Sequence, residues 1–373
     1  MIERWRNFWQ SFDWLMFGAA VLLTTLGLMT MYSFQGDNHY FEKQLIWLGV
    51  AIAAFFVAMI PDYRFLRVGN STFYIFLASI FLLLLIPIFG SETLGATQRL
   101  HFAFFAFQPS DLARLVLVIV LAKYFAKRHE QIGSLRHIFA SGIYAAIYFV
   151  LLYLQPDLGT AIIVFFIWLC MVLVAGIRVK HFLSFGAICL VAAVLAWNFG
   201  LADYQKTRIY TFLDPLSDIQ GDGYNAYQSI VAVGSGQLLG KGVGYGTQSK
   251  LLYLPYPETD FIFAAFAEEW GLVGSFTLFG IFLVLIWRLL RHAVLAASNF
   301  ETLFIAGVAI LLITQFIIHV GINIGVLPVT GTTIPFLSYG GSHLVMEFFA
   351  LGMVMAMSRY AHTRVTAKNL PFD

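Results

Sequence analysis

The chain has 373 residues, of which 60% are hydrophobic and only 11% are charged, with a formal net charge of +2. A mean hydropathy of +0.80 excludes an ordinary soluble domain, in which about 25% of residues are charged. Nothing in the sequence indicates a nucleic-acid partner. Both cysteines, Cys170 and Cys189, fall inside apolar runs, so no disulfide framework is expected.

Ten apolar runs approach the roughly 20 residues that a helix needs to cross a bilayer. They lie near 14–34, 44–61, 72–90, 110–126, 138–154, 159–176, 181–200, 261–287, 302–325 and 343–359. The first has no small-residue cleavage site and is expected to stay as a span. The chain is therefore predicted to be one all-α polytopic membrane domain over 1–373. Its long polar stretch, 201–260, is predicted to be one large extracellular loop.

The Lys and Arg residues predict the orientation, because positive residues gather in short cytoplasmic segments. With a cytoplasmic N-terminus, 15 of the 22 basic residues fall on the inner side. The outer side keeps only Lys43, Arg99, Arg114, Lys206, Arg208, Lys241 and Lys250. Both termini are therefore predicted to be cytoplasmic.

The fourth run opens with a helix-start signal that contains two opposite charges. Pro109 suits a first helical turn, and Asp111 complements the positive end of the helix. Asp111 and Arg114 are three residues apart, so they share one helix face and can pair. Two interpretations stay open, a structural ion pair and an anion site that faces an inner cavity.

Two further segments rich in helix breakers separate apolar runs. In residues 155–160, Asp157 follows a proline and either caps the next helix or lines a wet cavity, and we favour the cavity wall. Residues 328–342 contain Ser338 among several glycines, which allow close backbone approach. A packing turn and a functional segment fit this second stretch equally well.

The long loop contains a glycine-rich run around Lys241. It is not a Walker motif, because Ser235 stands at the position of the first glycine and Gly242 follows the lysine. Glycine backbone near Lys241 and Arg208 could instead cradle a lipid-linked pyrophosphate. The alternative is a flexible extracellular loop.

The loop ends at Asp260, directly before the apolar run 261–287. A carboxylate at a membrane face is expensive, so it is treated as a functional hypothesis. Glu268 and Glu269 follow about two helical turns later, on nearly the same face. Two adjacent carboxylates at this depth are costly unless they are paired, neutral or facing water.

Seven motifs in order, spread over nearly the whole chain, resemble the SEDS family (shape, elongation, division and sporulation). They are FQPS-acid-x-x-base, QPDLGT, YQxxR, GSG…GKGxGxGTQS, LP…TDFIF, EExG and PFxSYGGS. The resemblance implies a peptidoglycan glycosyltransferase that polymerises lipid II outside the bacterial cytoplasmic (inner) membrane. The GTQS wording and the short N-terminus are more similar to the elongation branch, RodA, than to the division branch, FtsW.

The resemblance also implies residue roles. The essential aspartate of the family falls on Asp260, as a direct base or as a ligand of Mg²⁺ or Mn²⁺. Asp111 and Arg114 stand where Glu and Lys are commoner. Two further departures accompany them. Tyr256 and Glu258 displace the usual glutamate by two positions, and His319 replaces a usual Asn.

Polymerising lipid II requires an activated sugar hydroxyl, cations for the leaving pyrophosphate and room for two lipid tails. Asp260 is the candidate for the first need, and Arg208, Lys241 and Arg114 are candidates for the second. Asp157 and Ser338 complete the expected substrate-binding set. The implied partners are a class B penicillin-binding protein and the elongation machinery. The alternatives are a lipid II flippase, a scaffold for the penicillin-binding protein, and a polymerase of another undecaprenyl-linked glycan.

Overall fold

The computed structural model describes residues 12–34, 39–89, 91–93, 96–102, 105–128, 135–176, 186, 194–214, 222–251 and 253–368. Nine long helices dominate this part of the chain. They are α2 (Trp14–Tyr32), α3 (His39–Ala58), α5 (Ser71–Phe89), α6 (Pro109–Ala126), α7 (Leu135–Leu154), α8 (Leu158–Ala175), α13 (Ile262–Val294), α14 (Asn299–Asn323) and α15 (Gly341–Lys368).

Eight of the described helices are long and apolar enough to cross a membrane. The ninth long helix, α6, carries Asp111, Arg114 and Lys123 and is buried along most of its length. The chain is thus a multi-pass membrane protein, and the predicted all-α membrane class is confirmed. Most of the predicted span 181–200 lies outside the described residues, and so does Cys189. The count of ten spans therefore stays a prediction.

Short elements join the long helices. They are α4 (Arg64–Arg67), β1 (Ser91–Thr93), β2 (Ala96–Phe102), β3 (Phe105–Phe107), a π-helix η1 (Ala196–Gly200), α10 (Asp203–Leu213), α11 (Asp222–Ser235) and α12 (Thr247–Lys250). The strands form a small antiparallel sheet of order β1-β2-β3, in which Leu100 faces Phe107. The predicted loop 201–260 therefore contains three helices in its described part.

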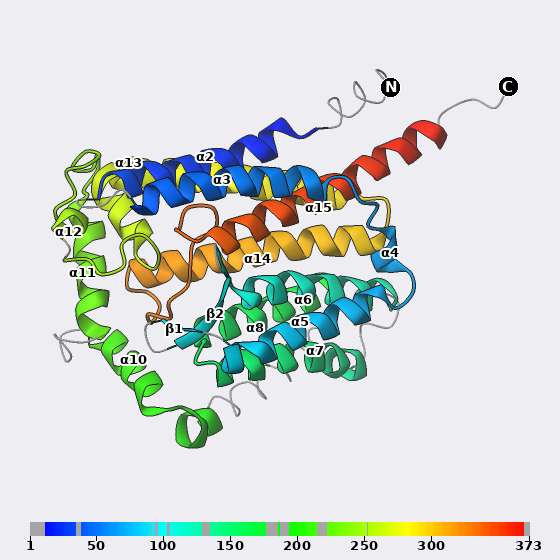
Figure 1. Ribbon diagram of the computed structural model, residues 1–373, viewed down its shortest axis with the longest axis horizontal. Coiled ribbons are helices and arrows are strands. Elements are labelled where there is room, and N and C mark those ends of the chain that lie inside the picture. Colours follow the sequence, from blue (N-terminus) through cyan, green and yellow to red (C-terminus); the bar gives the residue numbers. More distant parts are fainter. Residues whose placement is uncertain are drawn as a thin grey trace.

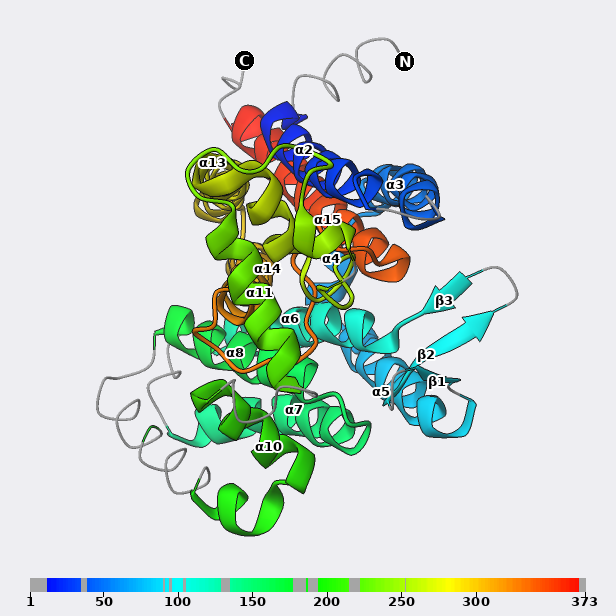
Figure 2. The same cartoon turned by 90° about the vertical axis from the view of Figure 1, so that its left-hand side faces the viewer.

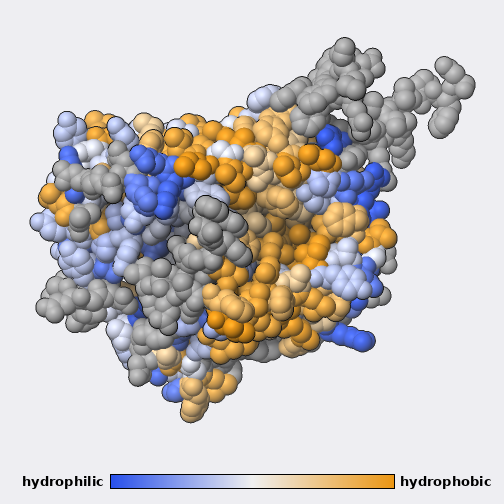
Figure 3. All heavy atoms as spheres, viewed as in Figure 1, coloured by the Kyte–Doolittle hydropathy of each residue, from blue (hydrophilic) through white to orange (hydrophobic). Residues whose placement is uncertain are grey.

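The helices form two groups joined by α14 (Figures 1 and 2). One group holds α2, α3, α13 and α15, and the other holds α5, α6, α7 and α8. Helix α14 contacts α13 and α15 on one side and α6 and α8 on the other. The start of α2 and the end of α15 lie at one end of the bundle, opposite α10, α11 and α12. Figure 3 shows hydrophobic side chains over the middle of this face and hydrophilic ones toward its two ends.

Helix α13 is broken at Gly271, and the long loop docks at the break. Gly271 has φ +65° and ψ −163°, outside the helical region. The Lys241 amide donates to the Glu268 carbonyl at 3.0 Å, and the Leu272 amide donates to the Gln237 carbonyl at 2.9 Å. A Cβ atom on residue 271 would lie 2.2 Å from the Gly240 nitrogen. Only glycine fits this approach, which positions the loop against the bundle.

Candidate active site

Asp260 lies in the turn that leads into α13, and α14 holds its backbone. The Tyr256 carbonyl accepts hydrogen bonds from the Thr259 and Phe261 amides at 3.2 and 3.4 Å. Tyr256 has a φ of +48°, a left-handed conformation that costs a non-glycine residue roughly 1–2 kcal/mol. The Asn323 side chain donates to the Asp260 carbonyl at 3.0 Å. The half-buried Asp260 carboxylate therefore lies on a strained turn. Hydrogen bonds to the Tyr256 carbonyl and from the Asn323 side chain hold this turn in place.

Ser338 ties the α14–α15 loop (residues 324–340) to the same turn. Its hydroxyl donates to the Thr259 carbonyl at 2.9 Å and accepts from the Ile334 amide at 3.0 Å. The Ser338 carbonyl accepts from the buried Gln44 side chain of α3 at 3.2 Å. Ser338 is far from Asp260 in the sequence, and the fold brings its loop to the turn that contains Asp260. The contacts of Ser338 hold this loop in place.

Gly331 brings the α14–α15 loop against the Asp260 carboxylate. A Cβ atom on Gly331 would lie 3.6 Å from Asp260 Oδ2. The hydroxyls of Thr330 and Thr332 on either side are buried and have no hydrogen-bond partner among the described residues. His319 donates from Nδ1 to the Thr332 carbonyl at 2.7 Å, and its buried Nε2 is equally unpartnered there. Buried polar atoms normally find partners, so these groups are suited to contact a polar ligand.

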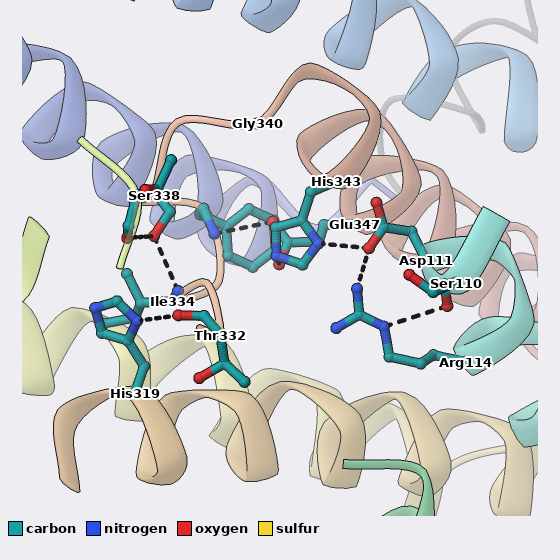
Figure 4. A network of polar contacts seen from close by, with 12 residues as sticks. Ser110, Asp111, Arg114, His319, Thr332, Ile334, Ser338, Gly340, His343 and Glu347 are labelled. Atoms are coloured by element: carbon teal, nitrogen blue, oxygen red, sulfur yellow. Dashed lines mark hydrogen bonds and ion pairs between the residues drawn. The ribbon is translucent and has the colours of Figure 1, made fainter. Parts of the chain in front are cut away.

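A buried cluster of charged side chains lies between α6 and α15 (Figure 4). Arg114 and Asp111 form an ion pair within α6, as their spacing predicts. His343 Nδ1 lies 3.3 Å from Asp111 Oδ1, and His343 Nε2 lies 2.9 Å from Glu347 Oε1. The second contact is within ion-pair distance but off the line of a hydrogen bond. Each of the four residues is at most 6% exposed, so the cluster belongs to the protein interior.

Asp157 caps α8, and its neighbour Gly159 touches the α14–α15 loop. The Asp157 carboxylate accepts from the Thr160 amide at 3.1 Å. Burial raises the pKa of Asp157, while hydrogen bonds from Thr160 and the charge of Arg114 oppose the rise. A Cβ atom on Gly159 would lie 2.5 Å from the Thr330 carbonyl. The structure therefore shows Asp157 as a helix cap, and its place in a cavity wall stays a prediction.

Lys241 makes its contacts with α12 and α13 and not with the Asp111–Arg114 cluster. Its ammonium donates to Glu268 Oε1 and to the Thr247 hydroxyl, both at 2.7 Å. Glu268 is fully buried and also accepts from the amides of α12. A pyrophosphate contact by Lys241 would have to compete with this ion pair.

Arg208 lies half-buried on α10. This helix is at the opposite end of α11 from α12 (Figure 1). Its predicted contact with substrate stays a prediction.

His343, Glu347 and Asn323 are site residues that the sequence reasoning missed. A signal for the first two exists, because a His and a Glu four residues apart within an apolar run form a polar pair on one helix face. Asn323 gives no such signal, since its contact with Asp260 depends on how α14 packs against α13.

The described residues contain no group of three or more His, Cys, Asp or Glu side chains that could hold a metal ion alone. Mg²⁺ commonly takes one or two carboxylates and completes its shell with water and substrate phosphates. A single half-buried carboxylate such as Asp260 fits that kind of binding.

Comparison with known proteins identifies the family. Residues 5–363 match the FtsW/RodA/SpoVE family, described as cell cycle proteins. The chain is 35% identical to stage V sporulation protein E of Bacillus subtilis, over 94% of this chain and 97% of that protein. It is 37% identical to the peptidoglycan glycosyltransferase MrdB of Escherichia coli K12, over 80% of each chain. It is 34% identical to the probable peptidoglycan glycosyltransferase FtsW of Thiomicrospira cyclica, over 95% of this chain and 94% of that protein.

Solved structures agree in fold. One chain, from the work "Structural coordination of polymerization and crosslinking by a peptidoglycan synthase complex", matches with a TM-score of 0.82 and 30% identity, covering 94% of this chain and 98% of that one. The rod shape determining protein RodA of Thermus thermophilus matches with a TM-score of 0.69 and 27% identity, covering 94% and 98%. With its seven motifs, its helical bundle and these matches, the chain belongs to the FtsW/RodA/SpoVE family of cell cycle proteins, the SEDS family that its motifs resemble.

Proposed function

We propose that this chain is a peptidoglycan glycosyltransferase that polymerises lipid II into glycan strands during cell elongation and shape maintenance. The observation that carries the proposal is the approach of Gly331, in the α14–α15 loop, to the Asp260 carboxylate, in a loop segment whose neighbouring threonine hydroxyls are buried without a partner among the described residues. The names of the FtsW and MrdB relatives support the same activity.

In the proposed reaction, a sugar 4-hydroxyl attacks the anomeric carbon of a lipid-linked donor. The new C–O bond forms as the bond to undecaprenyl pyrophosphate breaks, and the hydroxyl proton passes to the Asp260 carboxylate. If a divalent cation takes part, Asp260 would hold it, and the ion would add positive charge beside the pyrophosphate.

Arg114 is the buried cation that we propose for the leaving pyrophosphate. Its Nη2 is paired with Asp111, and its Nε lies 3.4 Å from the Ser110 carbonyl. Within the described part of the chain, Nη1 donates no hydrogen bond. A guanidinium with free donors can bind phosphate oxygens. Arg208 and Lys241 would contribute from the long loop, and Asp157 and Ser338 would shape the site around Arg114 and Asp260.

The position of the charges favours this enzyme over a lipid II flippase. A transporter binds its substrate near the bilayer midplane. Here Asp111 lies in the first turn of α6, Asp157 caps the start of α8, and Asp260 directly precedes α13. A scaffold for a penicillin-binding protein would need none of these groups.

We place the chain in the bacterial cytoplasmic membrane, with both termini cytoplasmic and the long loop outside, where lipid II would be used. The excess of basic residues in the predicted inner segments supports this orientation. The proposed partner is a class B penicillin-binding protein within the elongation machinery, and the similarity to a chain of a peptidoglycan synthase complex supports it.

The proposed function is tested with lipid II in proteoliposomes that contain this chain and a class B penicillin-binding protein without glycosyltransferase activity of its own. We expect glycan polymer only when this chain is present. Lipid II crossing the bilayer without polymer would favour the flippase, and neither activity with a stable complex would favour the scaffold.

The metal requirement is tested on the same proteoliposomes. If a cation held by Asp260 takes part, EDTA should lower the polymerisation rate by about tenfold or more, because that cation would add positive charge beside the leaving pyrophosphate. Mg²⁺ or Mn²⁺ should restore the rate. An EDTA-treated sample that keeps its full rate would assign Asp260 to direct base catalysis.

Gly331→Ala should lower polymerisation by about tenfold or more, because the added methyl group would lie in van der Waals contact with Asp260 Oδ2 and take up space beside the carboxylate. Gly69→Ala is the matched control. Gly69 has φ +70°, almost equal to the +69° of Gly331, but an added Cβ there meets nothing within 4 Å. Both variants should lose similar stability, measured as the unfolding midpoint, and only Gly331→Ala should lose activity. Equal polymerisation activity in both variants would show that Gly331 is not part of the active site.

A further inference from the structure

His343 lies in the first turn of α15, and both of its ring nitrogens face carboxylates (Figure 4). Nδ1 lies 3.3 Å from Asp111 Oδ1, and Nε2 lies 2.9 Å from Glu347 Oε1. A neutral imidazole has one N–H group, so one nitrogen would turn a lone pair toward a carboxylate oxygen. The imidazolium carries an N–H on both nitrogens and is attracted by both partners. The geometry therefore favours a charged His343.

The charge count of the cluster leads to the same state. Asp111 and Glu347 contribute two negative charges, and Arg114 contributes one positive charge. Burying an uncompensated charge is expensive, and these side chains are almost completely buried. A charged His343 makes the four-residue cluster neutral. Two further titratable groups interact electrostatically with the cluster. His319 of α14 is influenced by His343, and Asp157 at the start of α8 is influenced by Arg114 and Asp111.

The cluster connects the Asp260 side of the site to Arg114. Glu347 Oε2 accepts from the amide of Phe336, in the α14–α15 loop, at 2.9 Å. This loop is the one that reaches Asp260 through Gly331. At the other end, Asp111 is shared between His343 and Arg114. In Figure 4 the second terminal nitrogen of Arg114 points away from Asp111 and Ser110.

We propose that His343 is a positioning residue that acts as the second buried cation of this site. Its imidazolium holds Glu347 and shares Asp111, so that Arg114 stays oriented toward an anionic group of the substrate, the pyrophosphate of a lipid-linked sugar. The inference deepens the proposed glycosyltransferase function and rests on it for the identity of that substrate.

A charge-balance cycle tests the inference in the full chain with its penicillin-binding protein. The variants are His343→Gln, Glu347→Gln and the double variant. His343→Gln leaves one net negative charge beside Arg114, so we expect the KM for lipid II to rise by about tenfold and the unfolding midpoint to fall. The double variant restores neutrality and should return the KM to within about threefold of wild type, with a higher midpoint than His343→Gln.

A merely structural role gives the opposite order, because removing both partners would then be at least as damaging as removing one. His137→Gln is the control. His137, at the start of α7, bonds the Tyr124 hydroxyl near the end of α6 at 3.0 Å, and its loss should leave the KM unchanged. A double variant no better than His343→Gln, or an unchanged KM in His343→Gln, would overturn the proposal.

Failure of the proposed function is recognised separately. If wild type makes no polymer, that function fails, and the shift of the unfolding midpoint on adding lipid II replaces the KM. The same order, with a weakened shift in His343→Gln and recovery in the double variant, would still support His343. No recovery, or no shift even in wild type, would reject its role in binding this substrate.

Discussion

Asp260→Ala is expected to reduce lipid II polymerisation by at least about 100-fold, because a general base contributes roughly 10²–10⁴-fold to a rate. The loss would be of similar or larger size if the carboxylate holds a cation. The fold should persist. The contact of residue 260 with Asn323 uses the backbone carbonyl, which alanine keeps. The measurement is polymer formation in proteoliposomes, with the unfolding midpoint recorded on the same preparation.

Two further variants sharpen the Asp260 experiment. Asp62→Ala removes an exposed carboxylate that pairs with Arg64 at 2.7 Å, ahead of α4, and should leave polymerisation unchanged. Asp260→Asn keeps the shape of the side chain but removes its charge and its basicity, so it should be nearly as inactive as Asp260→Ala. Full polymerisation by either Asp260 variant would exclude the carboxylate from the chemistry.

The helical fold was largely readable from the sequence because a membrane helix has to be predominantly apolar over about 20 residues. Helix α13 was predicted to end at 287 but continues to Val294. Its last turns contain Arg288 and His292, so they do not form part of the apolar run. Both residues contact Asp13 at the start of α2, at 2.7 and 2.6 Å. The short helices of the long loop are too polar to give an apolar run. The break at Gly271 depends on the docked loop and so has no local signal.

The site was predictable only where its contacts are local. The Asp111–Arg114 pair follows from a spacing of three residues on one helix. The contact of His343 with Asp111 joins residues 232 positions apart. No periodic pattern in a single sequence predicts such a long-range contact. Lys241 shows the same limit. Its charge and its glycine neighbours predict a phosphate contact, and pairing of Glu268 was considered, but no local pattern joins Lys241 to Glu268, which the fold brings together.

Loss of the Glu268 side chain should lower the stability of the protein strongly. Its Oε1 accepts from Lys241 Nζ at 2.7 Å, from the Thr247 amide at 2.8 Å and from the Thr247 hydroxyl at 3.0 Å. Its Oε2 accepts from the Gln248 and Ser249 amides at 3.1 and 3.4 Å. One buried carboxylate thus fixes the glycine-rich loop and the start of α12 onto α13. This explains why a charged side chain is tolerated within an apolar span.

Glu268→Ala should therefore destabilise the protein by about 3–5 kcal/mol, the usual effect of breaking a buried ion pair by removing one partner. It should also make residues 236–251 sensitive to limited proteolysis. Lys241→Ala is the matched control. The Lys241 side chain is 28% exposed, and Glu268 would keep its backbone donors, so the expected loss is only about 1.5–3 kcal/mol. The measurements are the unfolding free energy, the proteolysis pattern and the polymerisation rate of both variants.

The comparison of the two variants also decides what Lys241 does. If the ion pair with Glu268 is its main role, polymerisation should fall in proportion to the loosening of the loop, and more in Glu268→Ala than in Lys241→Ala. A Lys241→Ala protein that keeps its stability and its proteolysis pattern but loses polymerisation would mean that the ammonium leaves Glu268 to meet the substrate. In that case Glu268 would hold Lys241 in reserve for the pyrophosphate, and the sequence-based prediction for Lys241 would be confirmed.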